Sequence, residues 1–472
     1  MTSQPTASVG TYLDDSPVTR GHWKTLGLLG AGGFFDGFDI YLAGSVLSAM
    51  VATHFLSVGS TANFVSSTFA GLLVGTLLGG KLGDVFGRRT VYLYSLLIYG
   101  LFTVLAVFAV APWQLVVLRG LSGIGLGAVL IASYGMWSEV VPRRQRGRWG
   151  GLLALLVNIS QPASAGIALL VIPDFGWRAM FLIAGVPAFV VWFLQLRYLG
   201  ESPRWLEARG RLREAYDSAR AYNPATPQYT GDADPARPAG PATGRTGVRT
   251  RDLFRGRLLR PTIVASAVSV CFTVPYYAFQ AWVPTYLVKA GHPISTTLAF
   301  TFLMQLGAIP GNLLGGWLGD RFGRRKTLAV NFILLGLLGI PYSYPANDTE
   351  LVIVGFVWVT IANIMITSSI ASYVPEVFPT DVRMQGSAFA NAVSRAGTVV
   401  SPYAVTALFL GFGAPGVFLA SLLLFVIGAI VVLAVGFETR NRSLEEIAER
   451  ELGVTEAPGG LSTPVNASES GS

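Results

Sequence analysis

The sequence contains 472 residues, of which 52% are hydrophobic and only 13% are charged, and its formal net charge is +8. A soluble protein of this length would interrupt its apolar stretches with more charge, so the composition excludes an ordinary soluble protein and predicts a membrane protein. Because the cations cluster between apolar stretches, the positive charge indicates membrane topology rather than nucleic-acid binding.

The first 25 residues are polar and lack the cationic start and early apolar core of a cleavable signal peptide. Twelve apolar runs follow, most of them about 20 residues long, which is enough to cross a hydrocarbon core of ~30 Å at ~1.5 Å per residue. The expected spans are 26–48, 62–82, 91–111, 114–138, 150–171, 179–198, 261–287, 295–317, 327–344, 351–374, 386–407 and 416–436. The sequence therefore predicts an all-α membrane protein with twelve transmembrane helices.

A decapeptide occurs twice in the chain. Residues 80–89 (GKLGDVFGRR) return as residues 316–325 (GWLGDRFGRR), 236 positions later. Three further pairs recur at an offset of 237, namely Glu139 with Glu376, Arg146 with Arg383, and Glu201 with Glu438. A duplication of about half the chain predicts two pseudo-symmetric six-helix halves, an architecture found in secondary transporters.

The duplication sets the expected domain organisation. The parts are an N-terminal tail (1–25), a six-helix bundle (26–198), a central loop with a disordered linker (199–260), a second six-helix bundle (261–437) and a C-terminal tail (438–472). With the N-terminus in the cytoplasm, the other face of the membrane receives only Arg178 and Lys289 among the cations. We therefore expect both termini and the central loop to be cytoplasmic. Arginines outnumber lysines 30 to 4, which favours a bacterial gene and the bacterial inner membrane.

The paired loops resemble the signature of the major facilitator superfamily. Segments 176–181 (GWRAMF), 201–206 (ESPRWL), 375–383 (PEVFPTDVR) and 438–439 (ET) are similar to motifs of its branch of sugar porters, metabolite:proton symporters and organic ion transporters. The resemblance covers residues 23 to about 450. It implies the major facilitator fold and transport by alternating access.

Charged residues of these motifs can form a cytoplasmic latch. Arginine forks can bind glutamates bidentately, and an aspartate can accept hydrogen bonds from a neighbouring helix N-terminus. The expected latch residues are Asp84, Arg88, Arg89, Glu139, Arg146, Glu201, Asp320, Arg324, Arg325, Glu376, Arg383 and Glu438. The resemblance supports a latch that holds the halves together in the outward-open state. The alternative is that these residues only fix topology and folding.

Ionisable residues inside the membrane are costly and mark functional sites. Asp36 and Asp39 lie in the run FFDGFDIY (34–41), and their i,i+3 spacing puts them near one face of the first helix. Counted from Leu26, they lie ~15 Å and ~20 Å into the membrane. Because burial disfavours the charged form, either is a candidate proton carrier. The run is similar to one in aromatic-acid:proton symporters; the alternative is a structural aspartate, permanently paired or capping a kink at Gly37.

An arginine in the fourth span is a candidate partner for these aspartates. Arg119 lies ~9 Å below the interfacial Trp113, which is close to the depth expected for Asp39. Protonation of Asp39 would weaken an Asp39–Arg119 pair and could couple proton binding to substrate binding or helix movement. Arg119 resembles the helix-4 arginine of many facilitators. A purely structural pair is the alternative.

Arg395, in the eleventh span, is the candidate anion ligand. The expected spans of the second half offer no obvious acidic partner, and a buried guanidinium is costly alone, so a substrate carboxylate could supply the counter-charge. Organic anion transporters carry arginine at the matching place, which the resemblance carries over to Arg395. The alternative is that Arg395 extends to the interface or pairs with a loop acid.

Aromatic and amide side chains could complete a binding site for a planar acid. Amides can bind a carboxylate or hydroxyl, and aromatic faces suit a ring, although each residue could equally serve packing. With Arg395, the expected substrate-binding residues are Asn391, Tyr276, Tyr277, Gln280, Gln161, Gln305 and Trp358.

These features predict proton-coupled uptake of a small organic anion, such as an aromatic or other carboxylic acid, by a monomer in the lipid bilayer. The alternatives are a sugar or polyol symporter, a drug or metabolite exporter, and a non-transporting sensor. The sugar porters' Gln-Gln pair in helix 7 and the antiporters' Gly-Pro motif in helix 5 are both absent. We expect no enzyme, because no H-E-x-x-H, G-x-S-x-G or metal-ligand cluster occurs, and no cofactor beyond the proton gradient.

Overall fold

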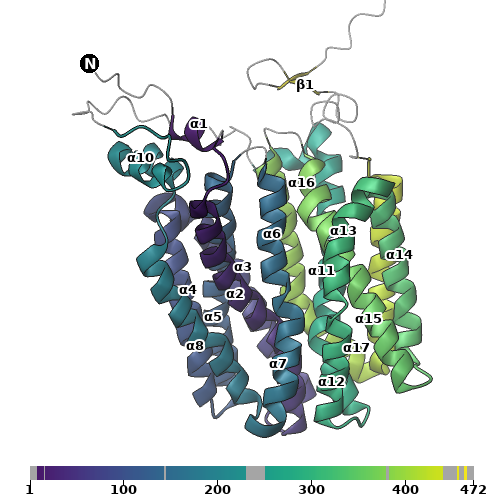
Figure 1. Ribbon diagram of the computed structural model, residues 1–472. Helices are drawn as coiled ribbons and strands as arrows, with labels where there is room; N and C mark the ends of the chain where they lie inside the picture. The colour runs from purple at the N-terminus through teal and green to yellow at the C-terminus, as the bar shows by residue number, and fades with distance from the viewer. Residues whose placement is uncertain are drawn as a thin grey trace, which may run out of the picture. The chain divides into compact units, whose positions relative to one another are not determined.

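A computed structural model describes residues 8–14, 16–142, 145–229, 250–378, 382–438, 454–456 and 462–464. The chain divides into two compact units, the first formed by residues 1–243 with 287–298 and the second by residues 244–286 with 299–472. Both units are built from long helices (Figure 1).

The first unit contains the first six expected spans. They are α2 (Arg20–Ala52), α3 (Val58–Phe86), α4 (Arg88–Leu105) extended by the 3₁₀ turn η1 (Ala106–Phe108), α5 (Pro112–Val140), the pair α6 (Arg146–Asn158) and α7 (Ser160–Phe175), and α8 (Trp177–Tyr198). Three short helices accompany them, α1 (Val9–Asp14), α9 (Pro203–Ala208) and α10 (Leu212–Arg220).

The second unit contains the other expected spans, except that residues 287–298, at the end of α11 and the start of α12, are grouped with the first. Its helices are α11 (Leu259–Lys289), α12 (Ile294–Gln305), α13 (Ala308–Phe322), α14 (Arg324–Ser343), α15 (Asp348–Met365), the π-helix η5 (Ile366–Tyr373), α16 (Val374–Glu376) and α17 (Arg383–Ala434). Two 3₁₀ turns, η3 (Thr250–Phe254) and η4 (Gly256–Leu258), precede α11, and two short strands, β1 (Val454–Glu456) and β2 (Ser462–Pro464), pair antiparallel.

Within the described residues, eleven helical segments are long and apolar enough to cross a membrane. The last of them, Gln385–Ala434, has 50 residues, more than twice the ~20 that one crossing needs. The backbone of Gly413 (φ 68°, ψ −163°) is not helical and divides this segment into two. The expectation of twelve transmembrane helices is therefore confirmed.

Glycines let α3 and α5 touch through their backbones. A Cβ atom at Gly71 would lie 2.0 Å from the carbonyl oxygen of Gly120, and one at Gly75 would lie 2.0 Å from that of Ile124. Small residues at four-residue spacing are typical of close helix contacts in membranes. Lipid tails are as apolar as the helices, so helix association relies on close packing rather than on the hydrophobic effect. The contact fixes α5, which carries Arg119, against α3.

The second unit repeats this contact. Gly307 and Gly311 approach α15, where added Cβ atoms would each lie 2.4 Å from a carbonyl oxygen, those of Phe356 and Thr360. The two glycines follow Gly71 and Gly75 at the same offset of 236 that separates the decapeptides. The duplication therefore includes the helix contacts as well as the loops.

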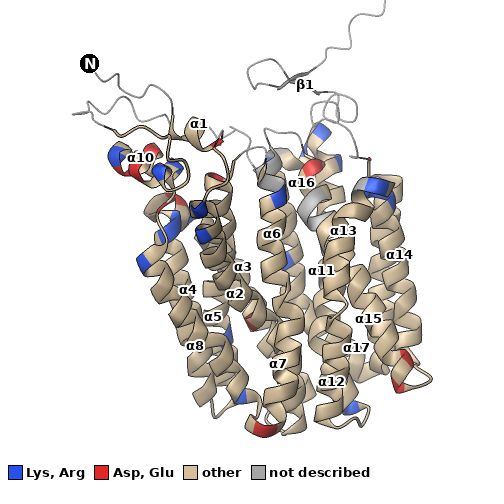
Figure 2. Ribbon diagram, viewed as in Figure 1, with Lys and Arg blue, Asp and Glu red and all other residues tan. Residues whose placement is uncertain are grey.

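Charged residues lie mainly near the helix ends of each unit, and the middle parts of the long helices contain few of them (Figure 2). Large apolar side chains are exposed instead, for example Leu170, Phe193, Leu313 and Leu419. Such surfaces suit a helix whose surroundings are lipid rather than water. We call the helix end that carries residues 84–89 the motif end of the first unit.

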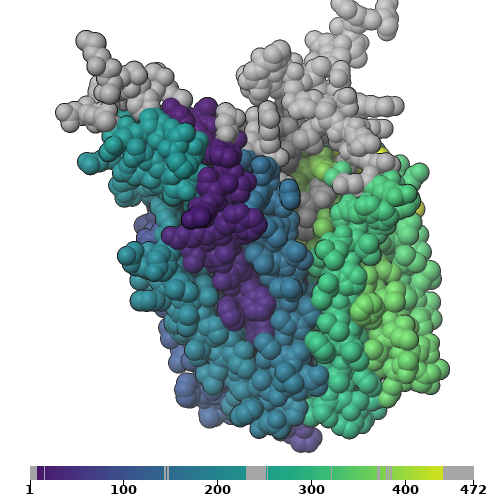
Figure 3. Space-filling model, in the orientation of Figure 1, coloured from purple at the N-terminus to yellow at the C-terminus, as the bar shows by residue number. Residues whose placement is uncertain are grey.

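The expected N-terminal tail contains an ordered helix that docks at the motif end. Figure 3 shows this segment in purple beside the teal α9–α10 region. Val9 donates its N–H to Oε1 of Glu207 at 2.9 Å, and Arg204 pairs with Asp14 at 2.8 Å. Val9 and Leu13 are fully buried. The composition of the first 25 residues gave no signal for this contact.

In each decapeptide motif, a glycine with positive φ precedes the helix that begins at the next residue. Gly87 (φ 100°) precedes α4, and Glu201 accepts the N–H of Arg89 at 3.0 Å. Gly323 (φ 91°) precedes α14, and Glu438 accepts the N–H of Arg324 at 2.8 Å. A carboxylate at a helix N-terminus is favoured because it meets unpaired N–H groups and the positive end of the helix dipole.

We predict that Gly87→Ala lowers the melting temperature of the detergent-solubilised protein more than Gly176→Ala does. Both glycines combine positive φ with extended ψ, a region that is essentially restricted to glycine, so both variants are strained by about 1–3 kcal/mol. At Gly176 the new Cβ meets nothing within 4 Å, whereas at Gly87 it would lie 2.3 Å from Oε2 of Glu201. Displacing that carboxylate costs a charge-assisted hydrogen bond, about 1.5–3 kcal/mol. Equal losses in the two variants would contradict this account of the cap.

Candidate functional site

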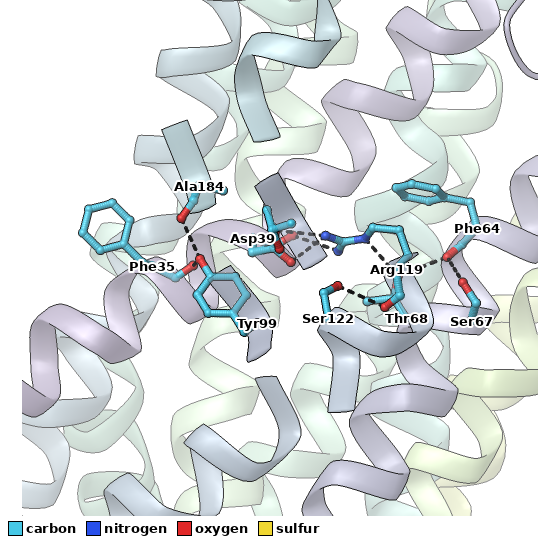
Figure 4. A network of polar contacts seen from close by, with 10 residues as sticks. Phe35, Asp39, Phe64, Ser67, Thr68, Tyr99, Arg119, Ser122 and Ala184 are labelled. Carbon is cyan, nitrogen blue, oxygen red and sulfur yellow. Dashed lines mark hydrogen bonds and ion pairs between the residues drawn. The ribbon is translucent and has the colours of Figure 1, made fainter. Parts of the chain in front are cut away.

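The centre of the first unit holds a buried ion pair (Figure 4). Nη1 of Arg119, on α5, lies 2.7 Å from Oδ2 and 2.9 Å from Oδ1 of Asp39, on α2. Both side chains have zero exposure. The pair that the sequence predicted from matching membrane depths is therefore confirmed as a contact.

Neighbouring helices complete the surroundings of the pair. Nε of Arg119 donates to the hydroxyl of Thr68 on α3 at 3.3 Å, and Thr103 on α4 donates to Asp39 at 3.4 Å. The Arg119 guanidinium also lies 5.4 Å from the ring centre of Phe64 and 5.8 Å from that of Phe181. The charges are thus held by two threonines and two aromatic faces, and the sequence indicated none of these four partners.

A tyrosine fixes the helix that carries the aspartates. The hydroxyl of Tyr99, on α4, lies 3.0 Å from the carbonyl oxygen of Phe35 and 2.8 Å from that of Ala184 (Figure 4). It thereby links α4 with α2 and α8. Asp36 follows Phe35 in α2 and is also buried, with 1% of its surface exposed. Of the two predicted proton carriers, Asp39 is the one with a described ion pair to Arg119.

This arrangement can couple the protonation of one carboxylate to the charge of the whole site. With Asp39 ionised, the pair is neutral overall, and its desolvation cost is offset by close contact and hydrogen bonds. If Asp39 takes up a proton, the site carries the positive charge of Arg119, which keeps its proton in proteins. A buried net charge is expensive, so protonation favours either a rearrangement or the arrival of an anion.

The second unit brings several of the predicted substrate residues together. Tyr276 on α11 stacks near Trp358 on α15, with ring centres 6.5 Å apart, and Phe279 stacks on Trp358 at 3.8 Å. One turn beyond Tyr276, Gln280 accepts a hydrogen bond from the amide of Gln305 on α12. Tyr277 contacts Tyr276 edge to face at 5.2 Å. These residues form one aromatic and amide cluster.

A cleft adjoins this cluster within the second unit. It lies between α11, α14, α15 and α17 and is partly open to the outside. Phe279, Trp282 and Trp358 line it, together with Phe409 and Phe418 of α17. Phe409 and Phe418 were not predicted, because a phenylalanine in an apolar span looks the same whether it faces lipid or a cleft.

Three further predicted substrate residues lie on α17 and α7. Arg395 and Asn391 are partly buried and one turn apart on α17, and the Asn391 amide donates to the carbonyl oxygen of Ser387 at 3.0 Å. Gln161 is buried on α7 of the first unit. Within the described residues, no group of three or more His, Cys, Asp or Glu side chains could hold a metal ion.

The motif arginines of the first unit make two kinds of contact. Arg88 pairs with Asp84 at 2.7 Å and with Glu139 at 3.1 Å. The guanidinium of Arg89 instead donates to the carbonyl oxygens of Leu199 at 2.6 Å and Leu196 at 2.7 Å, where α8 ends. The carboxylate that receives a helix N-terminus is therefore Glu201, whereas the expected acceptor Asp84 is part of an ion pair.

The second unit repeats this arrangement. Arg324 pairs with Glu376 at 3.0 Å, and Glu438 accepts backbone N–H groups at the start of α14. Arg325 donates to the carbonyl oxygens of Val432, at 3.1 Å, and of Leu433 near the end of α17. Each contact joins residues of one unit. The side chains of Arg146, Asp320 and Arg383 lie outside the described residues.

Comparison with known proteins places these features in a family. A family model described as Major Facilitator Superfamily matches residues 29–379 and 296–466. The inner membrane metabolite transport protein YdjE of Escherichia coli K12 is 32% identical over 444 residues, which cover 93% of this chain and 98% of that protein. The niacin transporter NiaP of Acinetobacter baylyi is 30% identical over 440 residues, covering 92% and 98%.

Solved structures agree on the fold. The xylose transporter XylE from E. coli, in a partially occluded inward open conformation, superposes with a TM-score of 0.69 at 18% identity. The match covers 90% of this chain and all of that one. At this identity the likeness shows the fold alone.

We predict that Asp39→Asn destabilises the protein more than Arg119→Gln does, and that the double variant recovers part of the loss. Asp39→Asn leaves a guanidinium buried without its counter-charge, which costs about 3–5 kcal/mol for a buried pair. Arg119→Gln leaves a carboxylate that a proton can neutralise, so its cost should shrink as the pH falls. Melting temperatures in detergent at pH 6 and pH 8 measure both effects. Equal losses for the two single variants, with no recovery in the double variant, would contradict a buried charge pair.

Proposed function

The chain belongs to the major facilitator superfamily and is a multi-pass membrane transporter rather than an enzyme, and from that premise we propose that it takes up a small organic acid together with protons. The observation that carries the proposal is the fully buried Asp39–Arg119 pair. In the proposed orientation both termini lie in the cytoplasm, and the protein acts as a monomer in the bacterial inner membrane.

Proton coupling is proposed for Asp39, assisted by Asp36 and Arg119. The carboxylate of Asp39 lies 2.7 Å from a permanent cation and is inaccessible to water in this state. Proton binding would release Arg119 from this bond, and the resulting buried charge would favour a different arrangement of α2 and α5. A cycle in which Asp39 is loaded on one side of the membrane and emptied on the other would link transport to the proton gradient.

The proposed substrate is an acid with an aromatic ring. The relative NiaP is named for niacin, a pyridine ring that bears a carboxyl group. In the second unit, Tyr276 and Trp358 offer aromatic faces, and the Gln280–Gln305 pair offers amide groups beside them. Aromatic faces bind a planar ring, and a guanidinium such as that of Arg395 binds a carboxylate with two parallel hydrogen bonds. Tyr277 and Asn391 are proposed to complete this site, and a role for Gln161 of the first unit stays a prediction from the sequence.

The motif residues are proposed to act as a conformational latch. Within each unit, an arginine–glutamate pair and a glutamate at a helix N-terminus organise the ends of three helices. Changing these contacts during the cycle would change the exposed charge at the motif end. Arg88→Ala or Glu139→Gln would then alter the rate of the conformational change.

Uptake by proteoliposomes of the purified protein tests the proposal. We expect an inwardly directed proton gradient to drive accumulation of radiolabelled nicotinate or benzoate above equilibrium, while xylose and inositol enter no faster than in empty liposomes. Asp39→Asn should abolish gradient-driven accumulation, because its side chain cannot cycle a proton. Arg395→Ala should lower uptake of the acid at least tenfold, because the substrate carboxylate would lose its guanidinium partner. A tenfold loss corresponds to about 1.4 kcal/mol.

The matched control is Asp174→Asn, which removes an exposed carboxylate at the end of α7 and should leave uptake unchanged. Accumulation in the Asp39→Asn variant equal to that of the wild type would refute proton coupling through Asp39. Gradient-driven accumulation of xylose or inositol alone would refute the organic-acid assignment and leave the coupling intact.

A further inference from the structure

Two cations share one exposed aromatic ring where α2 begins and α8 ends. Nζ of Lys24, on α2, lies 5.1 Å from the ring centre of Tyr198, and Cζ of Arg197, on α8, lies 5.6 Å from the same centre. Tyr198 is 51% exposed and Trp23, beside Lys24, is 57% exposed. We call Arg20, Trp23, Lys24, Arg197 and Tyr198 the α2–α8 corner.

The α2–α8 corner carries positive charge that the described residues do not neutralise. In the described part of the chain, no carboxylate oxygen lies within 4 Å of a charged atom of Arg20, Lys24 or Arg197. The first turn of α2 contains no acidic residue, so the positive end of its helix dipole adds to the cations.

The neighbouring side chains Glu201 and Arg89 form hydrogen bonds with backbone groups outside the α2–α8 corner. Glu201, three residues beyond Tyr198, accepts the N–H groups of Arg89 and Ser202. The guanidinium of Arg89 already bonds the carbonyl oxygens of Leu196 and Leu199 at the end of α8. Arg197 is therefore not required as a cap for α8, and its described contact is the ring of Tyr198.

We propose that the α2–α8 corner binds the phosphate of an anionic phospholipid headgroup. Two cations that each lie within about 6 Å of the same ring centre can both approach a single phosphate, and a bound anion would relieve their mutual repulsion. Lipid, rather than a soluble phosphate, is the proposed source because of the position of the corner. Lys24 lies two residues before the expected span 26–48, and Tyr198 is the last residue of α8. Aromatic residues at the ends of membrane helices are typical of the headgroup layer.

The bound lipid would connect two helices that the mechanism uses differently. α2 carries the ion-paired Asp39, and α8 supplies Phe181 and Ala184 to its surroundings. An anion held by Lys24 and Arg197 would tie the ends of these helices together and stabilise the arrangement described here. This proposal does not depend on the identity of the transported substrate, and its test needs no transport assay.

Native mass spectrometry of the full-length protein in detergent, titrated with dioctanoyl phosphatidylglycerol, measures the proposed site. We expect Lys24→Gln/Arg197→Gln to bind this lipid roughly thirtyfold more weakly, equivalent to about 2 kcal/mol at ~1 kcal/mol for each cation. Lys24→Arg/Arg197→Lys keeps both charges and should bind as the wild type does. Dioctanoyl phosphatidylcholine should show little difference between these proteins.

The matched control is Lys81→Gln/Arg213→Gln, which removes one exposed lysine and one exposed arginine of the same unit that share no ring. The proposal is overturned if this control loses as much affinity, because the effect would then be the general field of the protein. It is also overturned if Lys24→Gln/Arg197→Gln binds like the wild type while both fold, as judged by circular dichroism. Competition by inorganic phosphate at concentrations equal to the lipid would instead assign the corner to a soluble anion.

Discussion

The hydrocarbon core of a membrane supplies no hydrogen-bond partner, and this constraint organises most of the structure. Each span must satisfy its backbone internally, which only helices and closed barrels can do. The spans of this chain are helices, and the close contacts between them rely on glycines such as Gly75 and Gly311, where side chains would collide with backbone. No hydrophobic effect drives such helices together in lipid, so backbone contacts and polar bonds hold them instead.

The same constraint explains the uses of arginine. A helix end leaves carbonyl groups without partners, and guanidinium groups supply donors for them. Arg89 serves α8 and Arg325 serves α17, while Glu201 and Glu438 occupy the opposite type of helix end. Arg119 lies deeper in its unit, where a cation without a counter-charge would be unstable, and Asp39 supplies that counter-charge. A pair that is stable only while one member stays ionised is a natural site for proton control.

The two units repeat these solutions at matching positions. Gly87 with Glu201 corresponds to Gly323 with Glu438, and Arg88 with Glu139 corresponds to Arg324 with Glu376. The ion pair at Asp39 is the point at which the first unit differs, because the described cluster of the second unit, around Tyr276 and Trp358, is aromatic and uncharged. Duplication supplied a common framework, on which the first unit carries the buried Asp39–Arg119 pair and the second carries the cluster of rings and amides.

The sequence by itself determined the twelve spans, the duplication and the Asp39–Arg119 contact. Apolar length depends on composition, repeats are visible as text, and the rise of a helix converts residue number into membrane depth. Only the tertiary structure decided that Glu201 rather than Asp84 meets a helix N-terminus, that Arg89 bonds carbonyls rather than a carboxylate, and that α1 docks on Glu207. Those choices depend on the direction in which a side chain leaves its helix and on which segment lies beside it. Neither is encoded in spacing along one helix, because both arise where separate helices meet.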